Sequence, residues 1–420
     1  MPTPTYRLAA RLIHSAPFPR GKLAESLAGR RAAGARWLDW ASQQRTDGPL
    51  VWVHGASVGE ALSAQPVVAR MRAAVAGLQV VHSYTSPSAA RWPGSFNADR
   101  ADYLPLDDPC AVSATLDAVK PRLIVCSRGD LWPEWALAAE ARCIPLAVLA
   151  GTVRRTSGRL RWPVRRLLER AFRSVAYVGA MSPEDAARLE RLGVAPRNIV
   201  VTGDPRHDQV LERVTHLPPV RQLVAWAAGG DTLAAGSTDA AEEKVLLGAF
   251  IQVSRADPNA RLVLAPHEVS PARIGELVSA TQKLGIRATL WEGGRPRPDA
   301  NCLIVDEVGL LADLYAAAHV AYVGGGFRRG GLHAVIEPAA YAVPVIVGPR
   351  YRASRDACLL VEAGGAVALP LRAPAETLGR LWLNWITSPD ERSDAGLKAR
   401  GVLQQGAAQS SAHALFRLLE

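Results

Sequence analysis

The sequence of 420 residues has no apolar run of 18 residues, the length that a membrane-spanning helix requires. Its beginning also lacks the basic stretch and the following apolar stretch of a secretory signal. We therefore expect any association with a membrane to be peripheral.

Cysteine is scarce, with five residues spread between Cys110 and Cys358 and no C-x-x-C spacing. This pattern favours reduced, cytosolic thiols and indicates neither a zinc site nor a disulfide framework. Acidic residues are also few, 39 against 49 lysines and arginines, so the net charge is +10. Such an excess favours polyanionic partners, namely nucleic acid, an anionic membrane or a phosphorylated substrate.

The length exceeds what one hydrophobic core usually reaches, so we expect two domains. Strand-like runs alternate with helical stretches in both halves, which predicts parallel sheets with helices on both faces. We place a basic segment at 1–45, a first domain at 46–215, a linker rich in Pro and Gly at 216–230, a second domain at 231–400 and a final helix at 401–420.

The basic segment has two interpretations that stay open. It can lie against anionic lipid, or it can be an ordinary solvated helix. Its apolar stripe and neighbouring cations are Tyr6, Leu8, Leu12, Ile13, Arg7, Arg11, Arg20 and Lys22.

The clearest motif is V-W-V-H-G-A-S-V-G-E at residues 51–60. Its order of residue types predicts a strand, a tight turn and a helix. Glu60 then lies in the first helical turn at the carboxyl end of a strand, where open α/β sheets bind ligands, and is a candidate general base. Ser57-x-x-Glu60 is equally a capping box, in which Glu60 accepts a hydrogen bond from the Ser57 amide and has no catalytic role.

A second motif follows an expected strand at 321–323 and reads G-G-G-F-R-R-G-G-L-H-A-V-I-E-P at 324–338. Its glycines and a helix start at 330–333 predict an anion site made of backbone amides and the helix dipole. No Walker lysine follows the glycines, and a dinucleotide fingerprint fits poorly. Glu337 is placed to accept hydrogen bonds from ribose hydroxyls, with a solvated glutamate as the alternative.

Three weaker patterns lie between these motifs. Asp130 follows a strand at 123–126 and precedes Trp132-Pro133, which also fits a turn that opens a helix. Arg206 lies in V-V-T-G-D-P-R-H-D at 200–208 and is otherwise a surface turn residue. Asp239-x-x-Glu242 predicts another capping box.

Residues 154–173 contain eight arginines and one acid, Glu169. Apolar residues at helical spacing, from Val164 to Ala171, predict a basic amphipathic helix. Such helices bind membrane surfaces or phosphorylated lipids, although a solvated face is the alternative. We do not expect nucleic acid as a partner, because aromatic interleaving and a helix-turn-helix pattern are missing.

From about residue 50 to 365, these motifs resemble, in order, those of the bacterial lipid A Kdo transferases, where Kdo is 3-deoxy-D-manno-octulosonic acid. The glutamate of the family's H-G-A-S-V-G-E signature accepts a proton, which implies that role for Glu60. The family has the motif Glu-x-Glu-Leu-Trp-Pro, and this chain has Arg128 and Asp130 at the positions of its two glutamates. At the position of the lysine in the family's V-T-G-N-L-K, this chain has Arg206. The resemblance implies that Asp130 and Arg206 stabilise the transition state.

The resemblance also implies a nucleotide site in the second domain. Where the family has Pro-Arg-His, this chain keeps Pro266 and His267 and has Ala265 in place of the arginine. Where the family has G-G-H-N, this chain keeps His333 and has Ala334 in place of the asparagine. The implied nucleotide-binding residues are Pro266, His267, Val308, Gly309, Leu310, Gly325, Gly326, His333, Ala334 and Glu337.

The implied fold is α/β of the GT-B glycosyltransferase type, with two Rossmann-like domains facing an interdomain cleft and the last helix returning to the first domain. The implied reaction moves Kdo from CMP-Kdo to a phosphorylated lipid A precursor with inversion, without a metal or cofactor, at the cytoplasmic face of the bacterial inner membrane. The acceptor-binding residues are then Ser57, Gly59, Arg154, Arg165 and Arg166. Alternatives are a GT-B enzyme that uses a UDP-sugar, a sugar-nucleotide epimerase and a CMP- or lipid-binding relative with impaired catalysis.

Overall fold

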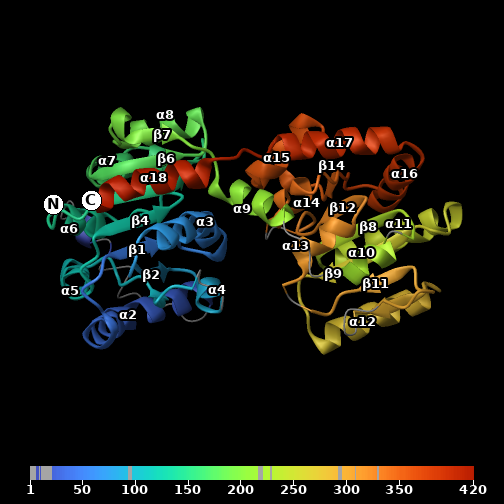
Figure 1. Ribbon diagram of the computed structural model, residues 1–420, viewed down its shortest axis with the longest axis horizontal. Helices are drawn as coiled ribbons and strands as arrows, with labels where there is room; N and C mark the ends of the chain where they lie inside the picture. The colour runs from blue at the N-terminus through green and yellow to red at the C-terminus, as the bar shows by residue number, and fades with distance from the viewer. Residues whose placement is uncertain are drawn as a thin grey trace. The chain divides into compact units, whose positions relative to one another are not determined.

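The computed structural model divides the chain into two compact units, each built around one sheet (Figure 1). Unit 1 comprises Met1–Gln209 and Gln404–Glu420, and unit 2 comprises Val210–Leu403. The residues that the structure describes are 6–8, 10, 21–92, 97–215, 221–227, 229–291, 296–307, 309–328 and 331–420.

Unit 1 contains a seven-stranded sheet in the order β3-β2-β1-β4-β5-β6-β7, and its neighbouring strands pair in parallel. The strands are β1 (Leu50–His54), β2 (Gln79–Tyr84), β3 (Arg100–Tyr103), β4 (Leu123–Ser127), β5 (Leu146–Gly151), β6 (Val175–Ala180) and β7 (Ile199–Val201). The helices are α2 (Lys22–Gln44), α3 (Val58–Ala74), α4 (Pro87–Ala90), α5 (Pro109–Val119), α6 (Pro133–Glu140), η1 (Gly158–Leu160), α7 (Val164–Arg173), α8 (Pro183–Leu192), η2 (Pro196–Asn198), α9 (Pro205–Val214) and α18 (Ala407–Leu419).

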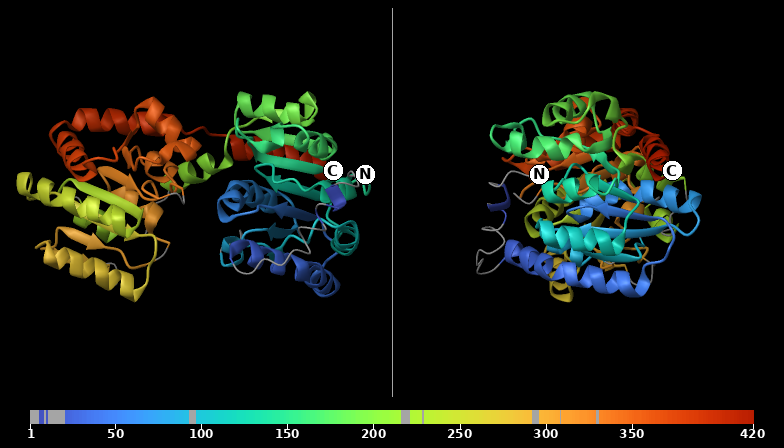
Figure 2. Two further views of the ribbon diagram at one scale, coloured as in Figure 1. Left: turned by 180° about the vertical axis from the view of Figure 1, so that it is seen from behind. Right: turned by 90° about the vertical axis from the view of Figure 1, so that its left-hand side faces the viewer.

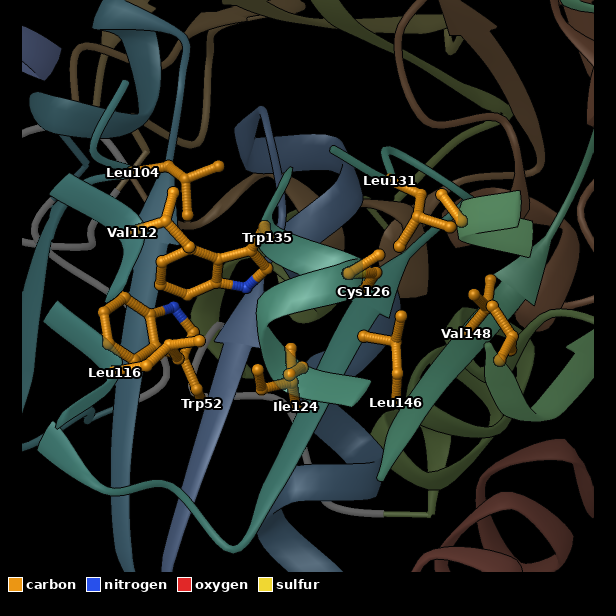
Figure 3. Packing of buried hydrophobic residues seen from close by; sticks show 14 of the residues in the cluster. Trp52, Leu104, Val112, Leu116, Ile124, Cys126, Leu131, Trp135, Leu146 and Val148 are labelled. Carbon is orange, nitrogen blue, oxygen red and sulfur yellow. The ribbon is translucent and has the colours of Figure 1, made fainter. Parts of the chain in front are cut away.

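Alternate residues of β1 point to opposite faces of this sheet, as strand geometry requires. Trp52 packs on one face, with ring centroids 4.5 Å from Trp37 of α2 and 4.8 Å from Trp135 of α6. Figure 3 shows Trp52 and Trp135 beside Val112 and Leu116 of α5. Val51 and Val53 belong to the core on the other face, which α3 and α18 cover.

Unit 2 also contains a seven-stranded parallel sheet, in the order β10-β11-β9-β8-β12-β13-β14. The strands are β8 (Thr232–Thr238), β9 (Arg261–Pro266), β10 (Ala288–Leu290), β11 (Cys302–Ile304), β12 (Val320–Val323), β13 (Val345–Val347) and β14 (Ala366–Ala368). The helices are α10 (Arg221–Ala227), α11 (Ala240–Ala256), α12 (Pro271–Lys283), α13 (Leu311–Leu314), η4 (Tyr315–Ala317), α14 (Ile336–Ala340), η5 (Tyr351–Ala353), α15 (Arg355–Ala363), α16 (Pro374–Thr387) and α17 (Pro389–Gly401). The predicted α/β class with parallel sheets is confirmed.

The ends of the units differ from the sequence-based boundaries. The first unit gives way to the second between Gln209 and Val210, inside α9, whereas the first domain was expected to end after this helix, at 215. Within the expected linker at 216–230, residues 221–227 form α10, while 216–220 and 228, with Pro218 and Pro219, lie outside the described residues.

The basic segment at 1–45 is not separate from the first domain. Its α2 buries Trp37 and Trp40 and packs against α5 and β3, which makes it part of the unit 1 core (Figure 2). Tyr6 donates a hydrogen bond to Asp107 at 2.5 Å, so its hydroxyl faces protein. Arg11, Leu12, Ile13 and Arg20 lie outside the described residues.

Candidate active site

Each sheet has one place where the strand order reverses, between β1 and β4 in unit 1 and between β8 and β12 in unit 2. Ligands of open α/β sheets bind outside the carboxyl ends of the strands at such a point. The two main motifs fall there: Glu60 follows β1, and the glycine-rich loop follows β12.

Glu60 lies in the first turn of α3, as predicted, but the predicted capping box is wrong. The Ser57 side chain makes no cap hydrogen bond, and Glu60 Oε2 accepts the Ala56 amide at 2.8 Å instead of the Ser57 amide. The turn is tight, because a Cβ at Gly55 would lie only 2.9 Å from the Ala61 nitrogen. This tight turn brings the Ala56 amide to the carboxylate.

The surroundings of Glu60 raise its pKa above the ordinary value of 4.5. Burial is the main cause and the negative charge of Asp130 adds to it, while the Ala56 amide, His54 and Arg128 act in the opposite direction. A raised pKa makes the carboxylate a better proton acceptor once it is ionised. Next to Glu60 in the chain, a Cβ at Gly59 would meet nothing within 4 Å among the described residues.

Asp130 follows β4 and is held by three side chains. His54 Nε2 lies 3.1 Å from Asp130 Oδ2, Trp132 Nε1 donates to the same oxygen at 3.3 Å, and Arg159 Nη2 lies 3.6 Å from Oδ1. Burial alone would raise the pKa of Asp130, but the hydrogen bond and charge of His54, with Arg159 and Trp132, lower it below 3.8. The two carboxylates thus have pKa values shifted apart, a pattern typical of assigned acid and base roles.

Arg206 is bound to the carboxylate of Asp204, two residues before it in the chain. Its Nε and Nη2 atoms lie 2.9 and 2.6 Å from Asp204 Oδ2. Arg128 Nη2 lies 3.5 Å from the same oxygen, and Arg128 Nε donates to Ser63 at 3.3 Å. The charge of Arg206 is therefore shared with Asp204, a buried acid that the sequence reasoning did not single out.

The glycine-rich loop of unit 2 differs from its prediction. Residues 331–335 are not helical and α14 begins at Ile336, so the expected helix start at 330–333 is wrong; Gly330 itself lies outside the described residues. Glu242 binds the amides of the loop: its Oε1 accepts hydrogen bonds from the Gly325 and Gly326 amides at 2.9 and 3.0 Å. A buried carboxylate of the protein therefore occupies the amides that were predicted to bind an anion.

Glu242 is fully buried and has further partners. Tyr322 donates to it at 3.1 Å, and so does the Asp239 amide, which confirms the capping box predicted for α11. Burial raises the pKa of Glu242, although the amide hydrogen bonds oppose that shift.

Two histidines come together near this loop. The rings of His267, which follows β9, and His333 have centroids 4.5 Å apart and planes inclined by 37°. Burial and the neighbouring His267 lower the pKa of His333 below 6.5, which favours a neutral ring at pH 7. Arg328, an exposed cation of the loop, pairs with Asp239 at 2.7 Å.

The remaining nucleotide residues predicted from the sequence lie in loops and short helices of unit 2. Pro266 ends β9, Gly309 has a φ of 98°, Leu310 precedes α13, and Ala334 is exposed. Glu337 is half-buried in α14, and its charge acts on Arg213 of α9 and on Tyr315. Val308 lies outside the described residues.

The arginine-rich segment forms the predicted basic helix α7, with Arg165, Arg166, Arg170 and Arg173 exposed. Val164, expected on the buried face, is exposed, and Phe172 is buried instead. Arg154, Arg165 and Arg166 are exposed but lie on the arginine-rich segment, apart in sequence from Ser57 and Gly59.

No described helix has the length and hydropathy to cross a membrane. Among the described residues, no three His, Cys, Asp or Glu side chains gather in a way that suits a metal ion.

Similar proteins identify the family of this chain. A family model described as 3-deoxy-D-manno-octulosonic-acid transferase (kdotransferase) matches residues 29–209. The 3-deoxy-D-manno-octulosonic acid transferase of Bordetella pertussis is 31% identical over 394 residues, which cover 88% of this chain and 89% of that protein. The enzyme of the same name from Haemophilus influenzae is 24% identical, covering 84% and 85% of the two chains.

A solved structure supports the fold. The UDP-GlcNAc 2-epimerase of Neisseria meningitidis, bound to UDP-GlcNAc, aligns with a TM-score of 0.61 at 14% identity, covering 88% of this chain and 100% of that one. This likeness, with the two parallel sheets, confirms the predicted GT-B fold class. The identity over nearly the whole length of the Bordetella protein places this chain in the family of 3-deoxy-D-manno-octulosonic acid transferases.

Proposed function

We propose that this chain moves Kdo from CMP-Kdo to a hydroxyl of a phosphorylated lipid A precursor, with inversion, in lipopolysaccharide biosynthesis. Membership of the family supports transfer of Kdo. The observation that carries the mechanism is the pair of carboxylates at the reversal point of the unit 1 sheet, Glu60 with a raised pKa and Asp130 with a lowered one.

In this mechanism Glu60 accepts the proton of the acceptor hydroxyl as that oxygen attacks the anomeric carbon of Kdo. Ser57 and Gly59 bind the acceptor, because they flank the carboxylate and leave room beside it. Burial raises the pKa of Glu60, and Asp130, which stays ionised, adds to this shift through its negative charge. Arg206 contributes positive charge only jointly with Arg128 and Asp204, because all three are bound together.

Unit 2 holds the CMP group in this proposal, through the residues named from the resemblance. Gly325 and Gly326 shape the site but do not donate hydrogen bonds to the CMP group, because their amides already donate to Glu242. His267, His333 and Arg328 are polar side chains in or near the described part of the loop that suit a phosphate. No metal takes part, and the assay below is therefore run with EDTA.

The surface around α7 suits an anionic membrane and the phosphates of the acceptor. Trp162 and Val164 are 77% and 41% exposed, and they lie among Arg154, Arg165 and Arg166, for which no ion pair is found in the described part of the chain. Exposed aromatic rings and cations together are typical of peripheral binding to membrane surfaces. This surface supports our proposal that the protein binds peripherally at the cytoplasmic face of the bacterial inner membrane.

The test is transfer of Kdo from CMP-Kdo to a tetraacylated lipid A precursor by the parent protein and by Glu60→Gln. Loss of the general base should lower kcat by about 10²- to 10⁴-fold. Glu190→Gln, an exposed glutamate of α8, serves as the matched control and should keep the parent rate. A folded Glu60→Gln protein that transfers within threefold of the parent would overturn the role of Glu60.

The same assay separates the alternatives. Inhibition by UDP but not by CMP would indicate a UDP-sugar donor. Conversion of a sugar nucleotide without any acceptor would indicate an epimerase, the activity named for the structural neighbour. Tight CMP binding without turnover would indicate a relative that has lost catalysis.

A further inference from the structure

We infer that Arg159 is a positioning residue that holds Asp130 and the preceding turn in place beside Glu60. This role is additional to the residues implied by the resemblance, and it rests on the proposed function. Its guanidinium group contacts the turn at residues 128–130, which follows the carboxyl end of β4.

Arg159 contacts this turn at two points. Its Nη1 donates a hydrogen bond to the Gly129 carbonyl at 2.6 Å, and its Nη2 lies 3.6 Å from Asp130 Oδ1. One planar group therefore contacts both the backbone and the carboxylate, which is a geometry that arginine provides and lysine does not. Asp130 is held on its other oxygen by His54 and Trp132.

The turn itself needs such support. Arg128 has a φ of 57° and Gly129 a φ of 85°, both in the left-handed region. A residue other than glycine is uncommon there and persists where its surroundings fix it. The Arg128 amide donates to Leu149 at 2.8 Å, whereas the Asp130 amide reaches Ser127 only at 3.4 Å, so the second half of the turn has the weaker backbone support.

Arg159 differs in its contacts from the other seven arginines of the segment at 154–173. The short helix η1, capped by Ser157, places Arg159 against the turn. The ion pairs found for the rest of the segment are Arg170 with Glu140 and Arg173 with Glu169. The Arg159 side chain is 41% exposed, so its loss should affect stability little and the geometry of Asp130 much more.

The experiment compares Arg159→Gln with Arg122→Gln in the transfer assay. Arg122 is an exposed arginine next to the amino end of β4, so it matches the change of charge without touching the turn. We expect kcat to fall about tenfold in Arg159→Gln, because a displaced group costs rate even when binding is unchanged. The KM for the acceptor should stay within about twofold, and Arg159→Lys, which keeps one donor, should recover part of the rate.

A second readout does not depend on activity. Backbone amide hydrogen exchange of residues 127–132, measured without substrates, should be faster in Arg159→Gln and unchanged in Arg122→Gln. Equal exchange in the two variants, or an increase in acceptor KM with kcat preserved, would overturn the positioning role. If the parent protein transferred no Kdo, the proposed function would fail while the exchange measurement still decided whether Arg159 holds the turn.

Discussion

The reversal points of the two sheets differ in how their charges are used. In unit 1, Glu60 accepts one amide hydrogen bond, has a raised pKa and lies beside an ionised Asp130. In unit 2, Glu242 is also a carboxylate in the first turn of a helix after a strand, yet four donors of its own unit bind it. The same local topology thus presents a carboxylate with one amide partner, our proposed general base, in one unit and a carboxylate with four partners in the other.

The number of hydrogen bonds separates the two roles. A carboxylate that is fully buried and accepts several hydrogen bonds is fixed in place and has no capacity left for a substrate. A half-buried carboxylate with one amide partner can accept a proton from a bound hydroxyl. We therefore expect removal of Glu242 to affect folding and removal of Glu60 to affect rate.

The largest effect on stability should come from Glu242→Ala. Its loss leaves the amides of Gly325 and Gly326 and the hydroxyl of Tyr322 without their acceptor, and each buried unsatisfied group costs about 1–3 kcal/mol. We expect the free energy of unfolding of unit 2 to fall by about 3 kcal/mol in urea titrations.

The exposed Glu362 of α15 provides the control for this prediction. Glu362→Ala should change the free energy of unfolding by less than about 0.5 kcal/mol. An equally small change in Glu242→Ala would mean that water replaces the carboxylate, and the contrast between the two units would then disappear.

A second effect concerns the pH dependence of the rate. Glu60 accepts a proton only when ionised, so kcat/KM should fall about tenfold per unit as the pH drops below its pKa. That pKa lies above 4.5, whereas Asp130 remains ionised because its pKa is lowered below 3.8. A rate profile measured where circular dichroism shows a folded protein should therefore give one acid limb above pH 4.5.

The position of that limb is diagnostic. A limb at or below pH 4.5 would contradict the raised pKa of Glu60. The residual activity of Glu60→Gln should lack the limb altogether, because glutamine does not titrate.

Local patterns in the sequence predicted local structure well. The residue types at 51–60 were enough to place Glu60 after β1, because strand, turn and helix each have short-range signals. The Asp239 capping box and the exposed arginines of α7 were likewise predicted from spacing of three or four residues.

Partners distant in the sequence could not be predicted in the same way. Glu242 and Gly325 are 83 positions apart, and His54 and Asp130 are 76 apart, so no local spacing links them. Ser57 is a residue type that commonly caps helices. The tight turn at Gly55 nevertheless brings the Ala56 amide, and not the Ser57 amide, to the Glu60 carboxylate. The sequence reasoning did not single out His54, although its place at the carboxyl end of β1, within the motif, is a signal that could have found it.

The smallest effect should be a gain in stability from Glu60→Gln. A carboxyl group with a raised folded-state pKa stabilises the protein below its unfolded pKa, and this contribution is lost as the pH rises through the folded pKa. Ionised Glu60 therefore destabilises unit 1 at neutral pH. Glutamine still accepts the Ala56 amide but carries no charge beside Asp130.

We accordingly expect Glu60→Gln to melt slightly above the parent at pH 7, with a smaller difference at pH 4, in paired thermal scans. Glu190→Gln, which changes an exposed glutamate, should show no such dependence on pH. A variant that is less stable than the parent at pH 7 would mean that the Glu60 charge stabilises unit 1, as the Glu242 contacts do in unit 2. A lower rate together with a higher melting temperature would instead show that unit 1 keeps a destabilising charge because the reaction requires it.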